Sequence, residues 1–128
     1  MTNHMNQYDK YNSATINTSS ANKFISVFDN IIKVLNDTKI AAEKKDTLGK
    51  INGFNKVVDA FRILKSIFEE APDDPLTESL IKFYHSAMEK AAELNTKEFS
   101  AKETDELINT VVLVRDSLVD SEKKGKLL

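Results

Sequence analysis

A twelve-residue stretch near the start of the chain, Phe24 to Leu35, restricts the possible fold more than any other segment. Eight of its twelve residues are large and apolar. At about 100° per residue, a helix places them in one stripe with two flanks. The stripe contains Phe24, Phe28, Ile31 and Leu35, one flank contains Ile25 and Ile32, and the other contains Val27 and Val34. This arc is roughly 180° wide, whereas a helix that buries one face needs only about 100°. We therefore expect a helix with neighbours on two sides, either a central member of a bundle or a helix with a partner still to come.

The composition favours one soluble helical domain. A chain of 128 residues is long enough for one core and hardly for two. Three Gly and two Pro are too few for a β-fold with many short turns. No apolar run reaches the roughly 18 residues of a membrane span, and the polar N-terminus lacks the apolar core of a secretion signal. We expect a cytoplasmic protein that does not insert into a membrane.

Several functional classes lack the residues that they require. A net charge of −2 with scattered cations argues against nucleic-acid binding. The absence of cysteine excludes thiolate metal sites and cysteine nucleophiles. His4 and His85 have no triad spacing, and Lys82 stands where a di-iron bundle needs Glu three residues before His85. Gly49 and Gly53 lack the Lys-Ser/Thr of a phosphate loop. The sequence predicts no enzyme activity, no cofactor and no metal site.

Capping residues divide the chain into four amphipathic segments. The predicted helices run from Ser20 to about Lys44, from Asp46 or Thr47 to about Glu70, from Pro75, capped by Asp74, to about Leu94, and from the capping box Ser100–Glu103 to about Glu122. Helices of roughly 20–25 residues joined by short turns are typical of an antiparallel up-down bundle. The predicted fold is therefore all-α, an antiparallel up-down four-helix bundle with a flexible N-terminal arm.

The chain is accordingly divided into an arm over residues 1–19, the bundle over residues 20–122 and a polar C-terminal tail over residues 123–128. The arm is rich in Asn, Ser and Thr but also contains three sizeable side chains, Tyr8, Tyr11 and Ile16. Two interpretations are open for them. They are exposed by chance, or the arm lays them on the folded body.

The second predicted helix has an unusual flank, on which small residues precede large ones. The flank contains Gly49, Gly53, Ala60, Ile63 and Ile67. Small residues let a neighbouring backbone approach, and the large ones farther along provide apolar contact. Glycine costs roughly 0.8–1 kcal/mol against alanine inside a helix. The two glycines therefore indicate either a packing or binding role, or simply a weak first turn.

Several short motifs occur in an order that points to a known family. They are Tyr8-x-x-Tyr11-Asn12-Ser13 and Ile16-Asn17-Thr18-Ser19-Ser20 in the arm, Val27-Phe28-Asp29-Asn30-Ile31-Ile32 in the first helix, the turn Lys45-Asp46, Phe83-Tyr84-His85-Ser86-Ala87-Met88 in the third helix and Val114-Arg115-Asp116-Ser117-Leu118 in the last. In this order and at nearly this spacing they resemble the flagellin-specific export chaperone family.

The resemblance implies a small cytoplasmic four-helix bundle that binds the C-terminal segment of flagellin. Such a segment is disordered when free and folds into an apolar groove on binding. The chaperone masks the flagellin face that would polymerise, then releases the subunit to the export machinery. The arm with Tyr8, Tyr11 and Ile16 would cover the empty groove until the client displaces it.

We place the client on the flanking apolar strips of three helices. The candidate client-binding residues are Ile25, Ile32, Ile63, Ile67, Ile108 and Val112. The competing interpretation is that these strips are ordinary core, filled by the other helices. For the chaperone, we expect a monomer or a weak homodimer.

Two other kinds of protein remain as alternatives. One is a structural or oligomeric bundle whose extra apolar strips meet a second copy of the chain. The other is a small bundle enzyme or metal protein, for which the sequence shows no constellation of side chains.

Overall fold

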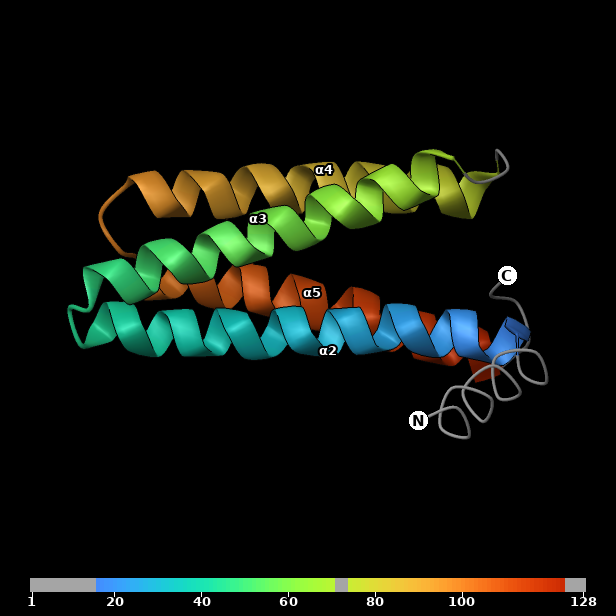
Figure 1. The fold of residues 1–128 in the computed structure, drawn as a ribbon, viewed down its shortest axis with the longest axis horizontal. Coiled ribbons are helices and arrows are strands. Elements are labelled where there is room, and N and C mark those ends of the chain that lie inside the picture. Colours follow the sequence, from blue (N-terminus) through green and yellow to red (C-terminus); the bar gives the residue numbers. More distant parts are fainter. Residues whose placement is uncertain (1–15, 71–73, 124–128) are drawn as a thin grey trace, which may run out of the picture.

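The computed structural model describes residues 16–70 and 74–123 and contains four long helices (Figure 1). They are α2 (Ile16–Glu43), α3 (Thr47–Glu69), α4 (Pro75–Thr96) and α5 (Ala101–Lys123). Consecutive helices run antiparallel, and no strand occurs within the described ranges. The predicted all-α up-down four-helix bundle is confirmed.

Two of the helix starts form as their sequences predict. A carboxylate oxygen of Asp46 accepts a hydrogen bond from the Gly49 N–H at 3.0 Å. Asp74 accepts one from the Thr77 N–H at 2.9 Å, and Pro75 is the first residue of α4. Each cap supplies an acceptor to a backbone N–H that has no partner inside the helix.

The fourth helix begins with only half of its predicted capping box. The Glu103 N–H donates to Ser100 Oγ at 3.1 Å, as expected. The Glu103 carboxylate is instead 2.7 Å from Lys90 Nζ and 2.6 Å from Lys97 Nζ. An ammonium group attracts a carboxylate more strongly than a backbone N–H does, because both partners then carry a full charge. The lysines hold the pKa of Glu103 at about 2 and tie the end of α4 to the start of α5.

The first helix begins earlier than the sequence analysis expects. We placed the start near Ser20, with residues 1–19 as an arm, but α2 begins at Ile16. Ile16 is therefore the first residue of α2. Asn, Ser and Thr disfavour helix by no more than about 0.7 kcal/mol each, too little to stop a helix that is already propagating. Tyr8, Tyr11 and the tail residues 124–128 lie outside the described residues.

The apolar stripes of the four helices meet in one core. Tyr84 lies at its centre, fully buried, with its ring centroid 6.1 Å from that of Phe28, 6.2 Å from that of Phe61 and 5.3 Å from that of Phe68. Burial raises the pKa of the Tyr84 hydroxyl. The other fully or nearly fully buried apolar residues are Ile31, Leu35, Phe54, Val57, Leu64, Leu80, Ala87, Ala91, Leu94, Leu107, Val111 and Leu118.

The four helices are arranged as two pairs. α3 and α4 pack most extensively and lie together above α2 and α5 in Figure 1. α2 contacts α3 and α5, and the diagonal pairs make no close backbone contact over the described residues. Figure 1 also shows α3 crossing obliquely, near α2 at its Thr47 end and away from it at its Glu69 end.

Candidate functional site

At one end of the bundle, two glycines let α3 approach α2 closely. A Cβ atom on Gly53 would overlap the hydroxyl of Thr38, and one on Gly49 would lie 3.0 Å from the Cβ of Ala41. Thr38 is itself buried, and its hydroxyl donates to the Val34 carbonyl oxygen at 2.6 Å. The packing interpretation is therefore confirmed for Gly53, whereas Gly49 lies chiefly against the side chain of its own cap residue, Asp46.

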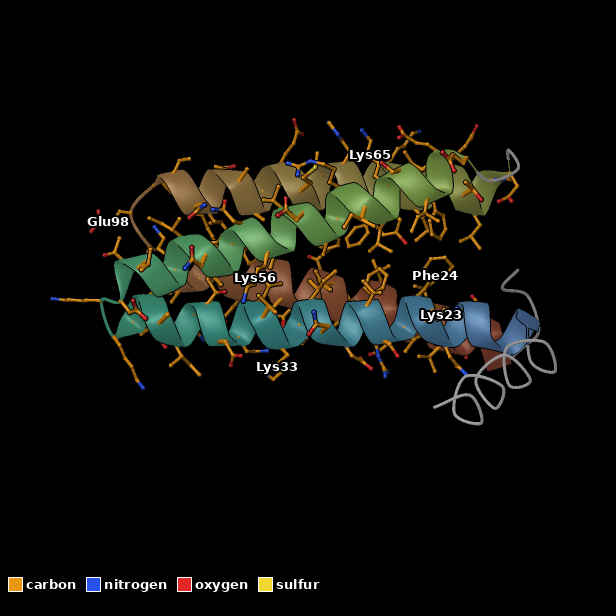
Figure 2. All side chains as sticks on the ribbon, in the orientation of Figure 1. Lys23, Phe24, Lys33, Lys56, Lys65 and Glu98 are labelled. Atoms are coloured by element: carbon orange, nitrogen blue, oxygen red, sulfur yellow. The ribbon has the colours of Figure 1, made fainter. Side chains whose placement is uncertain are left out.

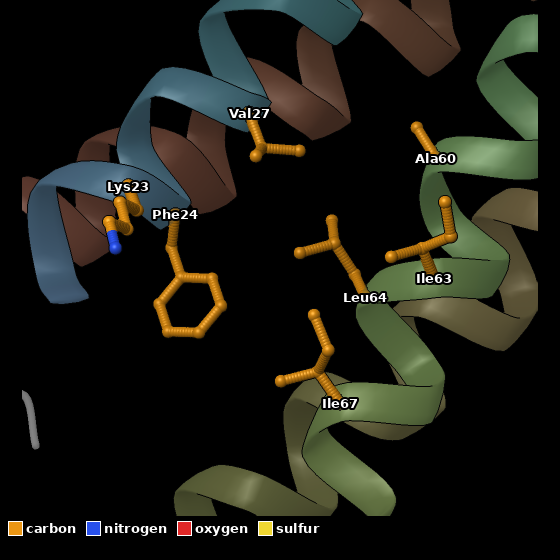
Figure 3. Close-up of a pocket in the computed structure, with 7 residues that line it drawn as sticks. All are labelled: Lys23, Phe24, Val27, Ala60, Ile63, Leu64 and Ile67. Carbon is orange, nitrogen blue, oxygen red and sulfur yellow. The ribbon is translucent and has the colours of Figure 1, made fainter. Parts of the chain in front are cut away.

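Farther along the same two helices, an apolar cavity of about 400 Å³ opens between them. Its lining residues are Lys23, Phe24 and Val27 from α2 and Ala60, Ile63, Leu64 and Ile67 from α3. Figure 3 shows Phe24 and Val27 of α2 separated by an open space from Ile63, Leu64 and Ile67 of α3. We call this cavity, defined by these seven residues, the α2–α3 groove. The groove exists because, along α3, small residues that allow close contact with α2 are followed by large ones that hold the two helices apart.

Two isoleucines of the α2–α3 groove are unusually accessible. Ile63 is 60% exposed and Ile67 is 48% exposed. They stand one helical turn apart, about 6 Å along the axis of α3. Side chains of this size are usually buried, and adjacent exposed ones mark a surface that a partner can cover. Both residues were predicted from the sequence as client-binding residues.

Ion pairs identify the side of α2 that faces α5. Arg115 makes two contacts with the Asp29 carboxylate, at 2.8 Å through Nε and 3.3 Å through Nη2. Lys39 Nζ lies 2.8 Å from Asp105 Oδ1. Ile32 falls between Asp29 and Lys39 on the same side of the helix, since residues three, four and seven apart share a face.

The remaining four predicted client-binding residues belong to this contact between α2 and α5. Ile108 is buried, with 9% of its surface exposed. Ile25, Ile32 and Val112 are half-buried and pack against the core. The structure therefore brings only Ile63 and Ile67 together in an open groove. For the other four, it favours the core interpretation that the sequence left open.

The sequence did not reveal the α2 wall of the groove. The prediction placed Phe24 in the central stripe of its helix and the client on the flank with Ile25 and Ile32. Phe24 does pack on the core, with its ring centroid 5.0 Å from that of Phe68, but Phe24 and Val27 also line the groove (Figure 3). A signal for the correct flank was present. Val27 lies on the same side of α2 as Thr38, eleven residues or about three turns later, and Thr38 is the residue that meets Gly53.

Two smaller hollows lie between α4 and α5. One, of about 220 Å³, includes Phe83, Lys90 and Glu106 in its lining. The other, of about 170 Å³, includes Leu76 and Leu113, which are 41% and 67% exposed. Each has roughly half the volume of the α2–α3 groove or less, and both contain more polar residues. These two hollows between α4 and α5 are the alternative binding surface with which the α2–α3 groove can be compared.

The described part of the chain has few groupings of side chains that suit metal binding or catalysis. No group of three or more potential metal-ligating side chains occurs there. His85 is exposed and lies 3.4 Å from Glu89 of its own helix. No helix in residues 16–70 and 74–123 is long and apolar enough to cross a membrane. What the described residues offer is a surface for an apolar segment.

The motifs that carry the family resemblance build the scaffold around the groove. Phe28 and Tyr84, from the first and third helices, pack in the core. Asp29 and Arg115, from the first and last helices, form the ion pair that joins α2 to α5. These four residues lie outside the lining of the α2–α3 groove, whereas Val27, from the first-helix motif, is part of it.

Comparison with known families identifies one match. Residues 4–120 match the family model described as Flagellar protein FliS. The match spans all of α2, α3 and α4, most of α5, and the segment that contains Tyr8 and Tyr11. A search of curated proteins finds none that matches this chain.

Proposed function

We propose that this chain, which belongs to the flagellar protein FliS family of export chaperones, binds the C-terminal segment of flagellin in the α2–α3 groove. The observation that supports this site is the exposure of Ile63 and Ile67 beside a cavity of about 400 Å³. Burial of exposed apolar surface is the main source of affinity in helix-in-groove recognition.

The geometry suits one amphipathic helix. Apolar side chains three or four residues apart on such a helix stand about 5–6 Å apart. Ile63 and Ile67 have the same spacing, so one partner side chain can sit between them while the next contacts Phe24 and Val27. The partner segment gains its helical structure on binding, and the cost of ordering it reduces the net affinity.

The consequence for flagellin is that its own assembly surface is covered. A bound C-terminal segment cannot pack against other flagellin subunits, so the chaperone prevents premature polymerisation in the cytoplasm. It then delivers the subunit to the export machinery.

The arm supplies an internal competitor in this proposal. Ile16 opens α2 about seven residues, or roughly 10 Å, before Lys23 at the groove. Tyr11 is five residues farther back, which at up to about 3.5 Å per residue is within reach of the groove. Tyr8 and Tyr11 occupy the groove until flagellin displaces them, whereas Ile16, being helical, serves as the pivot.

Co-purification from the native cell tests the partner. We expect flagellin to elute with the chain, and the purified chain to slow flagellin polymerisation in a turbidity assay at equal molar amounts. Neither effect would occur if flagellin were not the client. Light scattering on the chain alone tests self-association: a monomer or weak homodimer is expected. A constitutive dimer that buries Ile63 and Ile67 would favour the alternative of an oligomeric bundle.

A further inference from the structure

We propose that the α2–α3 groove selects an amphipathic helix with carboxylates along the edge of its apolar stripe. Lys23 and Lys56 form ion pairs with these carboxylates. This proposal rests on the proposed function for the groove itself. It adds a chemical requirement on the partner, a negative charge at each end of the apolar contact.

The first observation is the position of the two lysines. Lys23 lines the groove at its open end, beside Phe24. Lys56 lies three residues after Gly53 and four before Ala60, so it is on the side of α3 that faces α2. In Figure 2 it projects from α3 toward α2, and both lysines are exposed.

The second observation is that neither cation has an ion-pair partner among the described residues. The cations at the other helix contacts are paired, as Lys39 and Arg115 are between α2 and α5, and Lys90 between α4 and α5. Across the described parts of α2 and α3, no ion pair joins one helix to the other.

The nearby carboxylates do not complement these lysines. Asp59 stands one turn from Lys56 but is already paired, 2.6 Å from Arg62, and Glu69 is 3.9 Å from Lys65. Glu70 caps α3 beyond Ile67 and is not part of the groove lining. The groove is thus apolar with positive charge at its rim. At the rim of an interface such charges guide the approach of a complementary partner and suppress the wrong one.

The register of the two helices sets the spacing of the partner's carboxylates. Gly53 faces Thr38, so in an antiparallel pair Lys56 stands at the level of about Leu35. From Lys23 to that level is about twelve residues, or roughly 18 Å at 1.5 Å per residue. Two carboxylates eleven residues apart on the partner helix lie on nearly the same side of it. The flexible lysine side chains can also reach carboxylates that are somewhat closer together than the two lysine positions.

The test uses two synthetic helical peptides with one shared apolar stripe. One carries Glu and the other Lys at two edge positions eleven residues apart. Binding is measured by fluorescence anisotropy at low and high salt, with the wild-type chain and with the Lys23→Glu/Lys56→Glu variant. Lys44→Glu/Lys82→Glu is the matched control, because it changes the net charge equally at exposed positions with no ion pair among the described residues.

We expect the wild type and the control to bind the Glu-edged peptide about tenfold more tightly than the Lys-edged peptide at low salt, and salt to reduce this preference. The Lys23→Glu/Lys56→Glu variant should reverse it. The proposal is overturned if this variant retains the preference of the control, or if the wild type shows no preference or binds neither peptide.

The same proteins separate this proposal from the proposed function when the flagellin C-terminal segment is the ligand. If that segment binds and the Lys23→Glu/Lys56→Glu variant matches the control with every ligand, the charge requirement is wrong and the chaperone function stands. If the segment does not bind while the Glu-edged preference holds, flagellin is the wrong client and the charge requirement stands.

Discussion

Replacing Gly53 with alanine should destabilise the bundle, although alanine is the better helix former. The substitution gains about 0.8–1 kcal/mol of intrinsic helix preference. The new Cβ, however, would overlap the Thr38 hydroxyl and lie 2.8 Å from Thr38 Cβ and 2.9 Å from Thr38 Cγ2. Thr38 is 2% exposed and cannot swing into solvent. Overpacking of this kind costs about 1–3 kcal/mol. We expect a net loss of about 1 kcal/mol in the free energy of unfolding.

Urea unfolding followed by circular dichroism measures this loss, and two further variants locate its cause. Thr38→Ala removes two of the three overlapping atoms, so Gly53→Ala should cost less in that background. Gly49→Ala should cost less than Gly53→Ala in the wild-type background, because a Cβ there meets chiefly the side chain of Asp46. Stabilisation of the Gly53→Ala variant by about 1 kcal/mol, as at an open helical site, would refute the argument that the glycine permits contact between α2 and α3.

Three further substitutions test the scaffold. A double-mutant cycle on Asp29 and Arg115, measured by urea unfolding, should give a coupling of about 0.5–1 kcal/mol, because both side chains are partly exposed; a coupling of zero would remove the ion pair as a link between α2 and α5. The Glu103 pKa is lowered to about 2 by Lys90 and Lys97, so its stabilising effect is present above the unfolded-state pKa near 4.5 and disappears as the pH falls toward 2. Glu103→Gln should therefore be less stable than the wild type at pH 7, with the difference shrinking below pH 4.5; a difference that does not change with pH would contradict this. The buried Tyr84 hydroxyl has no hydrogen-bond partner among the described residues. In urea unfolding, Tyr84→Phe should therefore leave the free energy of unfolding unchanged or raise it by up to about 1 kcal/mol; a clear loss of stability would reveal a partner for the hydroxyl.

The helices were largely predictable because their signals are local. Asp46 and Asp74 are cap residues beside amphipathic segments, and both cap as expected. The start of α2 was not predictable from residue types, since several weakly disfavoured residues follow Ile16. The side chain of Glu103 was mispredicted because Lys90 of α4 and Lys97, the residue that follows α4, both reach it.

The candidate site was only partly predictable, for a related reason. Periodicity shows that a helix has two apolar flanks but not which neighbour each flank meets. Ile25 and Ile32 have the larger side chains, yet their flank faces α5, and the flank with Val27 faces the α2–α3 groove. The position of Ile63 beside a cavity could be foreseen because its flank on α3 changes from glycine to isoleucine, a pattern visible within one helix.

The central claim is that flagellin binds in the α2–α3 groove, and calorimetric titration of its C-terminal segment tests this most directly. The variants are Ile63→Asp in the groove and Leu113→Asp on α5, which replace apolar residues of similar exposure, 60% and 67%. Complete burial of such a side chain is worth about 1.5–3 kcal/mol, so covering the exposed part of Ile63 contributes about 1–2 kcal/mol.

Circular dichroism on both variants first establishes that each is folded, as expected for substitutions at exposed positions. We expect Ile63→Asp to weaken binding about five- to thirtyfold and Leu113→Asp to change it less than twofold. Unchanged binding by Ile63→Asp, together with loss of binding by Leu113→Asp, would contradict the account and place the client between α4 and α5.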